Sequence, residues 1–131
     1  MTRHAQIVGW GMAVPDRVLT NEQLSEIVDT SDEWIRSRTG IGQRHVVSHP
    51  SETTASLATS AGCAALEVAH ILPRQVDTII VATVTPDHPF PATACLVQDR
   101  MGATKASAFD LNAGCSGFVY ALGVASGLIA S

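Results

Sequence analysis

Two apolar runs rich in β-branched residues constrain the fold of this chain most strongly. The first spans residues 76–84 (VDTIIVATV) and the second spans residues 106–111 (ASAFDL). Near-continuous apolar runs of this length are typical of strands that are buried on both faces of a parallel sheet. A helix is expected between them over residues 92–101, closed by Gly102. The order strand, helix, strand predicts an α/β fold with a mainly parallel sheet.

The flanking segments extend this pattern. Residues 5–12 (AQIVGWGM) predict a further strand, interrupted by two glycines. Residues 53–72 carry an apolar stripe at helical spacing and end at Pro73, which predicts a helix. The sequence Thr20-x-x-Gln23 is a capping box that starts a short helix, and Thr30–Glu33 repeats it before a second short helix that ends at Gly40.

The uncharged stretch 113–131 is long enough to suggest a membrane helix. Its content of Gly, Ala and Ser favours instead a buried helix that follows the 106–111 strand in an α/β protein. This helix would end without a Gly cap and without Lys or Arg in its last turn. We therefore expect residues 1–131 to form one N-terminal domain, truncated, with a C-terminal half absent.

Composition excludes several classes of protein. Hydrophobic residues make up 46% and charged residues 15%, which indicates a globular chain. A net charge of −4 argues against nucleic-acid binding. The three cysteines form no C-x-x-C pair, so neither a metal site nor a disulfide framework is expected. Reduced thiols, and a first segment without a signal-peptide pattern, predict a cytoplasmic protein.

Cys115 is the candidate nucleophile. It lies between the 106–111 strand and the first turn of the following helix, among small residues. Free backbone N–H groups and the helix dipole stabilise a thiolate there. The alternative is a small cysteine buried in a tight turn. Cys63 and Cys95 are expected to pack in the core, and Ser116 lacks the second Gly of the G-x-S-x-G hydrolase elbow, where Phe118 stands.

A second candidate site contains Trp34 with three arginines nearby, Arg36, Arg38 and Arg44. An indole ring and guanidinium groups can hold a flat base, and arginines also bind phosphates. The alternative is a solvated basic face with a half-buried tryptophan. The five histidines are expected to be surface or capping residues, and Gly9-x-Gly11 is too incomplete for a dinucleotide fingerprint.

Three segments together resemble a known family. Residues 28–41 (VDTSDEWIRSRTGI), 81–95 (VATVTPDHPFPATAC) and 108–118 (AFDLNAGCSGF) are similar, in order and spacing, to segments of β-ketoacyl-acyl-carrier-protein synthase III. That family has the thiolase fold. The resemblance implies that Cys115 accepts the acyl group and that Trp34 and Arg38 sandwich the adenine of coenzyme A. It also implies that Thr30 lines the entrance and that Phe90 closes the partner's acyl pocket across a dimer interface.

The implied reaction is an acyl transfer followed by a condensation. Acyl-coenzyme A, typically acetyl-coenzyme A, loads the cysteine, and malonyl-acyl-carrier protein then condenses with the thioester. Coenzyme A thioester is a substrate, and no cofactor or metal is implied. The family's histidine and asparagine lie in a later half, so we expect the isolated chain to be inactive. Gly42-Gln43 also departs from the family's usual Arg-Glu.

Two alternatives remain open. The first is a related starter-type condensing enzyme of polyketide or quinolone synthesis, which shares the fold and the cysteine. The second is a non-catalytic fragment with a structural or partner-binding role.

Overall fold

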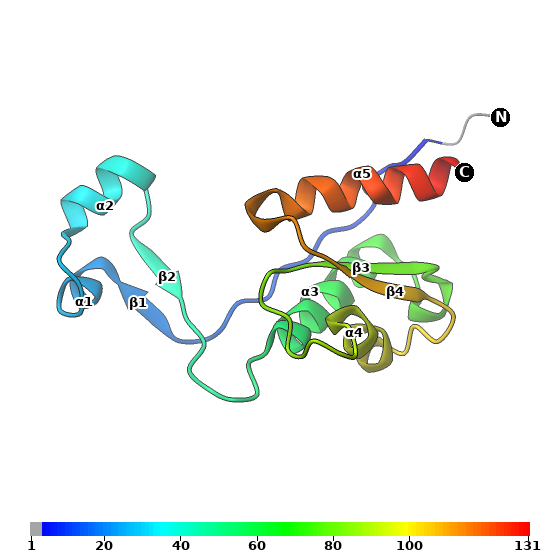
Figure 1. The fold of residues 1–131 in the computed structure, drawn as a ribbon, viewed down its shortest axis with the longest axis horizontal. Helices are drawn as coiled ribbons and strands as arrows, with labels where there is room; N and C mark the ends of the chain where they lie inside the picture. The colour runs from blue at the N-terminus through cyan, green and yellow to red at the C-terminus, as the bar shows by residue number, and fades with distance from the viewer. Residues whose placement is uncertain (1–3) are drawn as a thin grey trace. The chain divides into compact units, whose positions relative to one another are not determined.

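The computed structural model describes residues 4–131. They form two compact units: residues 14–52 make the smaller, and residues up to 13 together with residues 53–131 make the larger. Figure 1 labels the helices and strands of both.

The larger unit is built on a parallel pair of strands, β3 (Thr78–Ala82) and β4 (Ser107–Leu111). Thr78 lies opposite Ser107 and Ala82 lies opposite Leu111. Helix α4 (Thr93–Met101) connects them and ends at Gly102 in the left-handed conformation. The predicted strand–helix–strand unit is therefore confirmed, with both strands slightly shorter than the apolar runs.

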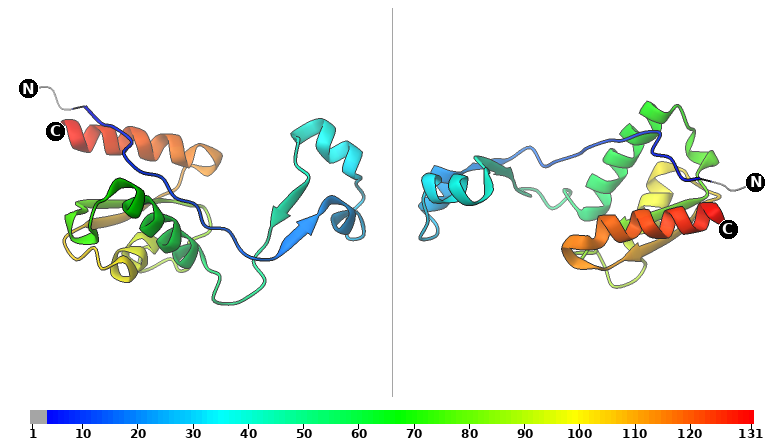
Figure 2. Two further views of the ribbon diagram at one scale, coloured as in Figure 1. Left: turned by 180° about the vertical axis from the view of Figure 1, so that it is seen from behind. Right: turned by 90° about the horizontal axis from the view of Figure 1, so that it is seen from above.

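Helices cover both faces of this sheet. Helix α3 (Thr54–Ala69) packs on α4 below the strands, and α5 (Gly117–Ala130) lies across the other face on β3 (Figures 1 and 2). The buried core consists of small and β-branched side chains, namely Ala55, Val81, Ala94 and Val97. Short 3₁₀ turns precede β3 (Pro73–Gln75) and α5 (Gly114–Ser116). The result is a helix–sheet–helix sandwich.

The strand predicted over residues 5–12 does not form. Among the described residues, β3 pairs only with β4, and residues 4–13 belong to no strand. The segment instead runs against α3, where a Cβ atom on Gly9 would overlap the carbonyl oxygen of Ala65 and one on Gly11 would overlap that of Ala61. The two glycines thus permit contact between two backbones and do not interrupt a strand.

The helix after Cys115 is less buried than predicted. Gly117 is the only buried residue of α5, although Ala121 and Ala125 are half-buried. Several large apolar side chains of the helix are exposed, among them Val119, Leu122 and Leu128. Within residues 4–131, the main contacts of α5 with a strand are those with β3 on one side of the helix, and many of its large side chains remain exposed.

In the smaller unit, β1 (Val18–Thr20) pairs antiparallel with β2 (Gln43–His45). Helix α1 (Asn21–Ser25) begins at the predicted capping box of Thr20. Helix α2 (Asp32–Thr39) ends at Gly40 as predicted, but its cap is Ser31, whose hydroxyl accepts the backbone N–H of Trp34. The capping box predicted at Thr30 therefore does not form, and a simple cap by Ser31, one residue later, takes its place.

No helix in the described part of the chain is long and apolar enough to cross a membrane. This holds for α5, which covers most of the uncharged stretch.

Glu52 fixes the loop that precedes α3. Its carboxylate accepts backbone N–H groups from Ser48 at 2.7 Å, His49 at 2.9 Å and Asp16 at 3.4 Å. The bond from Ser48 is the largest effect and lowers the pKa of Glu52 below its usual value of 4.5. Desolvation opposes it, and the bonds from His49 and Asp16 add smaller effects that lower the pKa further.

We expect Glu52→Gln to weaken the acid sensitivity of the protein. Because the folded pKa is lowered, the ionised carboxylate stabilises the fold fully above pH 4.5 and loses that effect as pH falls through the folded pKa. Urea unfolding at a series of pH values should show a shallower decline below pH 4.5 in the variant. An unchanged pH profile would contradict this assignment.

Candidate active site

Cys115 lies where the sequence predicts it, between β4 and α5. It belongs to the 3₁₀ turn Gly114–Ser116, which leads directly into the helix, and its side chain is exposed. The residue is therefore exposed in the described chain, which argues against the alternative of a small cysteine buried in a tight turn.

Two glycines set the position of this turn. Gly114 has φ of 54°, a left-handed conformation that side chains disfavour. Gly117 begins α5 so close to β3 that an added Cβ would lie 3.2 Å from the Cβ of Ala82. The start of α5 is thereby held against the end of a strand, which fixes the position of Cys115.

The N-terminus of α5 is free of side-chain caps. Ser116 precedes the helix but makes no side-chain capping bond within the described residues. The first N–H groups of a helix and its dipole favour a negative charge. A thiolate or a developing oxyanion beside Cys115 would meet this positive end.

The other two cysteines occupy different environments. Cys95 is half-buried on α4, with its Sγ 3.9 Å from the carbonyl oxygen of Ala108. Cys63 is exposed on α3, so its predicted core packing is wrong. The reason is that its neighbour Gly62 faces Met101 on α4, which turns Cys63 away from the core. Cys95 lies in the first turn of α4, but the first two N–H groups of that helix donate to the carboxylate of Asp110, whereas Cys63 lies in the middle of α3.

Trp34 and Arg38 lie one turn apart on α2, so they share a face of the helix. Both are exposed, Trp34 to 58%, whereas Ile35 is buried on the inner side. Beside the indole is a hollow of about 320 Å³, lined by Asp29, Thr30, Ser31 and Trp34. Thr30, displaced from its predicted capping role, is thus part of this hollow's wall.

The other two arginines of the predicted constellation serve the fold. Arg36 forms an ion pair with Asp32, with its Nε 2.8 Å from the carboxylate. Arg44 donates to the side chain of Asn21 at 2.6 Å and to the carbonyl oxygen of Leu19 at 3.2 Å. Arg38 is exposed and, within the described residues, makes no side-chain hydrogen bond or ion pair, in contrast to Arg36 and Arg44.

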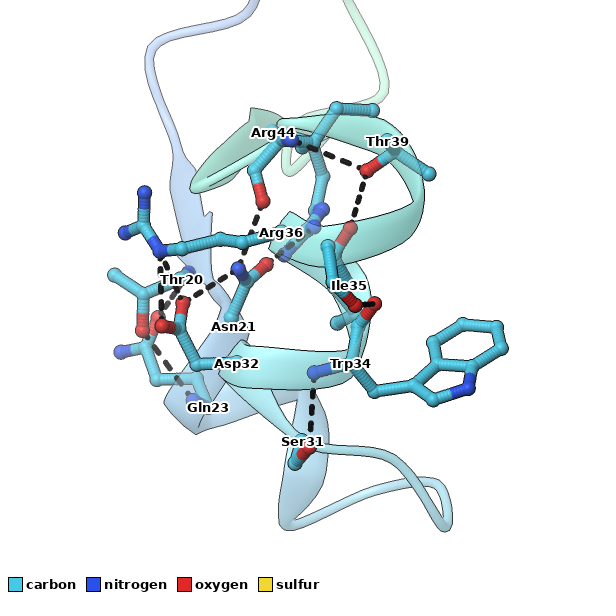
Figure 3. A network of polar contacts seen from close by, with 12 residues as sticks. Thr20, Asn21, Gln23, Ser31, Asp32, Trp34, Ile35, Arg36, Thr39 and Arg44 are labelled. Carbon is cyan, nitrogen blue, oxygen red and sulfur yellow. Dashed lines mark hydrogen bonds and ion pairs between the residues drawn. The ribbon is translucent and has the colours of Figure 1, made fainter.

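A polar network behind α2 was not predicted from the sequence. Asn21 is fully buried at its centre. Its Nδ2 donates to Asp32 at 2.7 Å and to the carbonyl oxygen of Ile41 at 2.8 Å. Figure 3 shows these bonds together with the indole of Trp34, which points away from the network. Asp32 has its pKa lowered by the hydrogen bond from Asn21 and then by that from Arg36. The only sequence signal for this network is that Asn21 directly follows the helix cap Thr20. Sequence alone does not distinguish such an asparagine from a surface residue.

Phe90 lies on the proline-rich loop after β3 and is 89% exposed. The loop is attached to the start of α3, because Asp87 accepts the backbone N–H of Ala55 at 3.2 Å and Thr54 donates to the carbonyl oxygen of Thr85 at 2.7 Å. Phe90 and Cys115 belong to the larger unit, whereas Thr30, Trp34 and Arg38 belong to the smaller. No group of residues suited to hold a metal ion occurs in the described part of the chain.

Comparison with known proteins shows what the chain is similar to. The family described as 3-oxoacyl-[acyl-carrier-protein (ACP)] synthase III matches residues 109–131, which include Cys115. The β-ketoacyl-[acyl-carrier-protein] synthase III of Roseiflexus sp. (strain RS-1) is 58% identical over all 131 residues. That of Xylella fastidiosa (strain 9a5c) is 54% identical over 128 residues, or 98% of the chain.

The chain matches the N-terminal portion of the β-ketoacyl-[acyl-carrier-protein] synthase III family.

Solved structures show the same similarity. The synthase III of Aquifex aeolicus VF5 superimposes with a TM-score of 0.89 at 47% identity, over 98% of this chain and 40% of that one. The priming β-ketosynthase of the R1128 polyketide pathway gives 0.92 at 33% identity, over 99% and 39%. The predicted α/β, thiolase-like fold is thereby confirmed. The chain spans about 40% of the length of its Roseiflexus and Xylella relatives.

Proposed function

We propose that this chain forms the part of a β-ketoacyl-acyl-carrier-protein synthase III that carries the nucleophile and the coenzyme A site. The reaction is the initiation step of fatty-acid synthesis in the cytoplasm. An acyl-coenzyme A primer, typically acetyl-coenzyme A, condenses with malonyl-acyl-carrier protein. The observation that carries the proposal is 58% identity with the Roseiflexus synthase III over the whole chain.

Cys115 performs the first step as a nucleophile. Its thiolate attacks the carbonyl carbon of the acyl thioester, and the new C–S bond replaces the bond to the sulfur of coenzyme A. Coenzyme A leaves as a thiol and takes the proton that Cys115 gave up. The exposed thiol at the uncapped start of α5 supports this role, because the helix N–H groups stabilise the negative charge at the reacting centre.

The second step forms the carbon–carbon bond. Malonyl-acyl-carrier protein loses CO₂, and its carbanion attacks the acyl carbonyl on Cys115. The cysteine is released as the thiolate, and β-ketoacyl-acyl-carrier protein is the product. The resemblance implies that a histidine and an asparagine from a later segment assist the decarboxylation, so this step needs residues beyond the matched portion.

Trp34 and Arg38 bind the adenine of coenzyme A in this proposal. Their placement on one exposed face of α2, beside a hollow partly lined by Thr30, supports it. A flat base can stack on the indole while the guanidinium covers its other face.

The active form is a homodimer in this proposal. The edge of β4 that faces away from β3 is unpaired in the described chain. Antiparallel pairing of that edge with a second copy would join the sheets of two subunits. Phe90, on its exposed loop, would then close the acyl pocket of the partner.

A starter-type ketosynthase of polyketide synthesis is the second candidate, favoured by the TM-score of 0.92 with the R1128 enzyme. The chain is only 33% identical to that enzyme. The identity of 58% to the Roseiflexus protein is higher and favours the role of a synthase III in fatty-acid synthesis.

Product formation tests the proposal. The chain is incubated with acetyl-coenzyme A and malonyl-acyl-carrier protein, alone and with a separately produced polypeptide covering the remaining length of the Roseiflexus relative. We expect β-ketoacyl-acyl-carrier protein only in the combined sample, because carbanion formation needs donors positioned opposite the cysteine. Product from the chain alone would contradict the need for later residues, and no product in either sample would contradict the proposed activity.

A further inference from the structure

We propose that Asn21 is a positioning residue for coenzyme A binding, which it controls by holding both ends of α2. This inference rests on the proposed function, because it assigns a purpose to the orientation of Trp34 and Arg38. Asn21 itself is fully buried and does not touch the ligand site.

The contacts of Asn21 bracket the helix. At the first turn of α2, its Nδ2 donates to Asp32 at 2.7 Å. Beyond the last turn, the same nitrogen donates to the carbonyl oxygen of Ile41 at 2.8 Å. The backbone N–H of Asn21 donates to the carbonyl oxygen of Gly42 at 3.3 Å. One residue of α1 thereby connects the beginning of α2 with the segment after its end.

The amide can bind in one orientation only. Its Oδ1 accepts from the guanidinium of Arg44 at 2.6 Å, and both Nδ2 hydrogens have acceptors. A flipped amide would place its NH₂ group against a guanidinium and its oxygen against the Asp32 carboxylate. All hydrogen-bonding groups of the side chain are therefore used, and the loss of one leaves buried partners unsatisfied.

Helix α2 needs such a clamp because it is short. It has 8 residues, and Ile35 is its only buried side chain. Isolated helices of this length are marginal in water, so contacts outside the helix determine its stability and direction. Trp34 and Arg38 are exposed on the same short helix, and a shift of α2 would move both of them relative to a bound base.

The test compares variants of two residues of α1: Asn21, which bonds to α2 and to the segment after it, and Gln23, which bonds only within its own capping box. Asn21→Ala removes the clamp. Asn21→Asp keeps an oxygen for Arg44 but loses both donor bonds. Gln23→Ala is the matched control, because Gln23 completes the capping box of α1 at 3.0 Å from Thr20 and makes no bond to α2. Trp34→Ala tests the ligand site separately.

Two measurements are made on each variant: the dissociation constant for coenzyme A by calorimetry, and hydrogen exchange of the peptide covering α2. We expect Asn21→Ala and Asn21→Asp to raise the dissociation constant about tenfold, a part of the effect of a lost stacking contact. Exchange over residues 32–42 should rise in both. Gln23→Ala should alter neither quantity, although it destabilises α1.

The outcomes separate the two proposals. Unchanged exchange over residues 32–42 in the Asn21 variants would overturn the clamp, whatever the ligand does. Faster exchange with unchanged affinity would show that Asn21 is structural only and would also overturn the inference. Unchanged affinity in Trp34→Ala would instead refute the coenzyme A site of the proposed function. An equal loss of affinity in Gln23→Ala would show general destabilisation and refute a specific role for Asn21.

Discussion

We expect Cys115→Ala to abolish acylation of the protein by acetyl-coenzyme A in a labelling experiment. Loss of a covalent nucleophile lowers rates by about 10⁴-fold or more. The thiol lies at the uncapped start of α5, where helix N–H groups favour the thiolate. Cys95 lies in the first turn of α4, but the first N–H groups of that helix donate to Asp110. Mass mapping of the peptides, with the chain combined with the remaining length of its Roseiflexus relative, locates the acetyl group.

The other two cysteines provide the controls. Cys63 is the more stringent control, because its thiol is exposed and could also react with acetyl-coenzyme A, whereas Cys95 is half-buried. Cys63→Ala and Cys95→Ala should therefore retain the label on Cys115. Exposure alone would label Cys63 as readily, so acetyl groups on Cys63 in place of Cys115 would refute the assignment.

The second large effect is expected at the coenzyme A site. Trp34→Ala removes one stacking face and should weaken binding by about 1–3 kcal/mol, which corresponds to about 5- to 150-fold in the dissociation constant. Arg38→Ala should produce a loss in the same direction, because the guanidinium covers the second face of the base. Calorimetric titration with coenzyme A measures both.

The chain offers a matched control variant for Trp34→Ala and another for Arg38→Ala. Trp10 is 76% exposed in the other unit, so Trp10→Ala controls for loss of a surface indole. Arg74 is exposed on the turn before β3, so Arg74→Ala controls for loss of one positive charge. If Trp10→Ala weakened binding as much as Trp34→Ala, the specific adenine site would be refuted.

Much of the larger unit could be predicted because its signals are local. The apolar runs that became β3 and β4 are nearly continuous, and Gly102 ends α4 in the left-handed conformation expected of it. Strands that lie between two helical layers are apolar at most positions, and this pattern is visible without any knowledge of contacts.

The errors arose where non-local contacts decide. Residues 5–12 have the composition of a strand, but their packing on α3 is visible only in three dimensions. Strands β1 and β2 have three residues each, too few for a periodic pattern, and they form because they pair with each other. The exposure of α5 depends equally on what packs beside it.

The candidate site divides in the same way. The position of Cys115 follows from its place in the strand–helix order, so sequence reasoning found it. Among the arginines, the sequence cannot separate Arg38 from Arg36, because the difference is the ion pair of Arg36 with Asp32. Asn21 was missed because its burial and its three partners come from α2, β2 and the loop between them.

The contact between residues 5–12 and α3 limits which substitutions can compensate for one another. An overlap with a side chain can be relieved by a smaller residue on the facing helix. The atoms that face Gly9 and Gly11 most closely are carbonyl oxygens of Ala65 and Ala61, which every amino acid carries. No change of side chain on α3 can therefore make room. These two positions should stay glycine without covarying with α3, whereas the alanines of the helix remain free to vary with their side-chain neighbours.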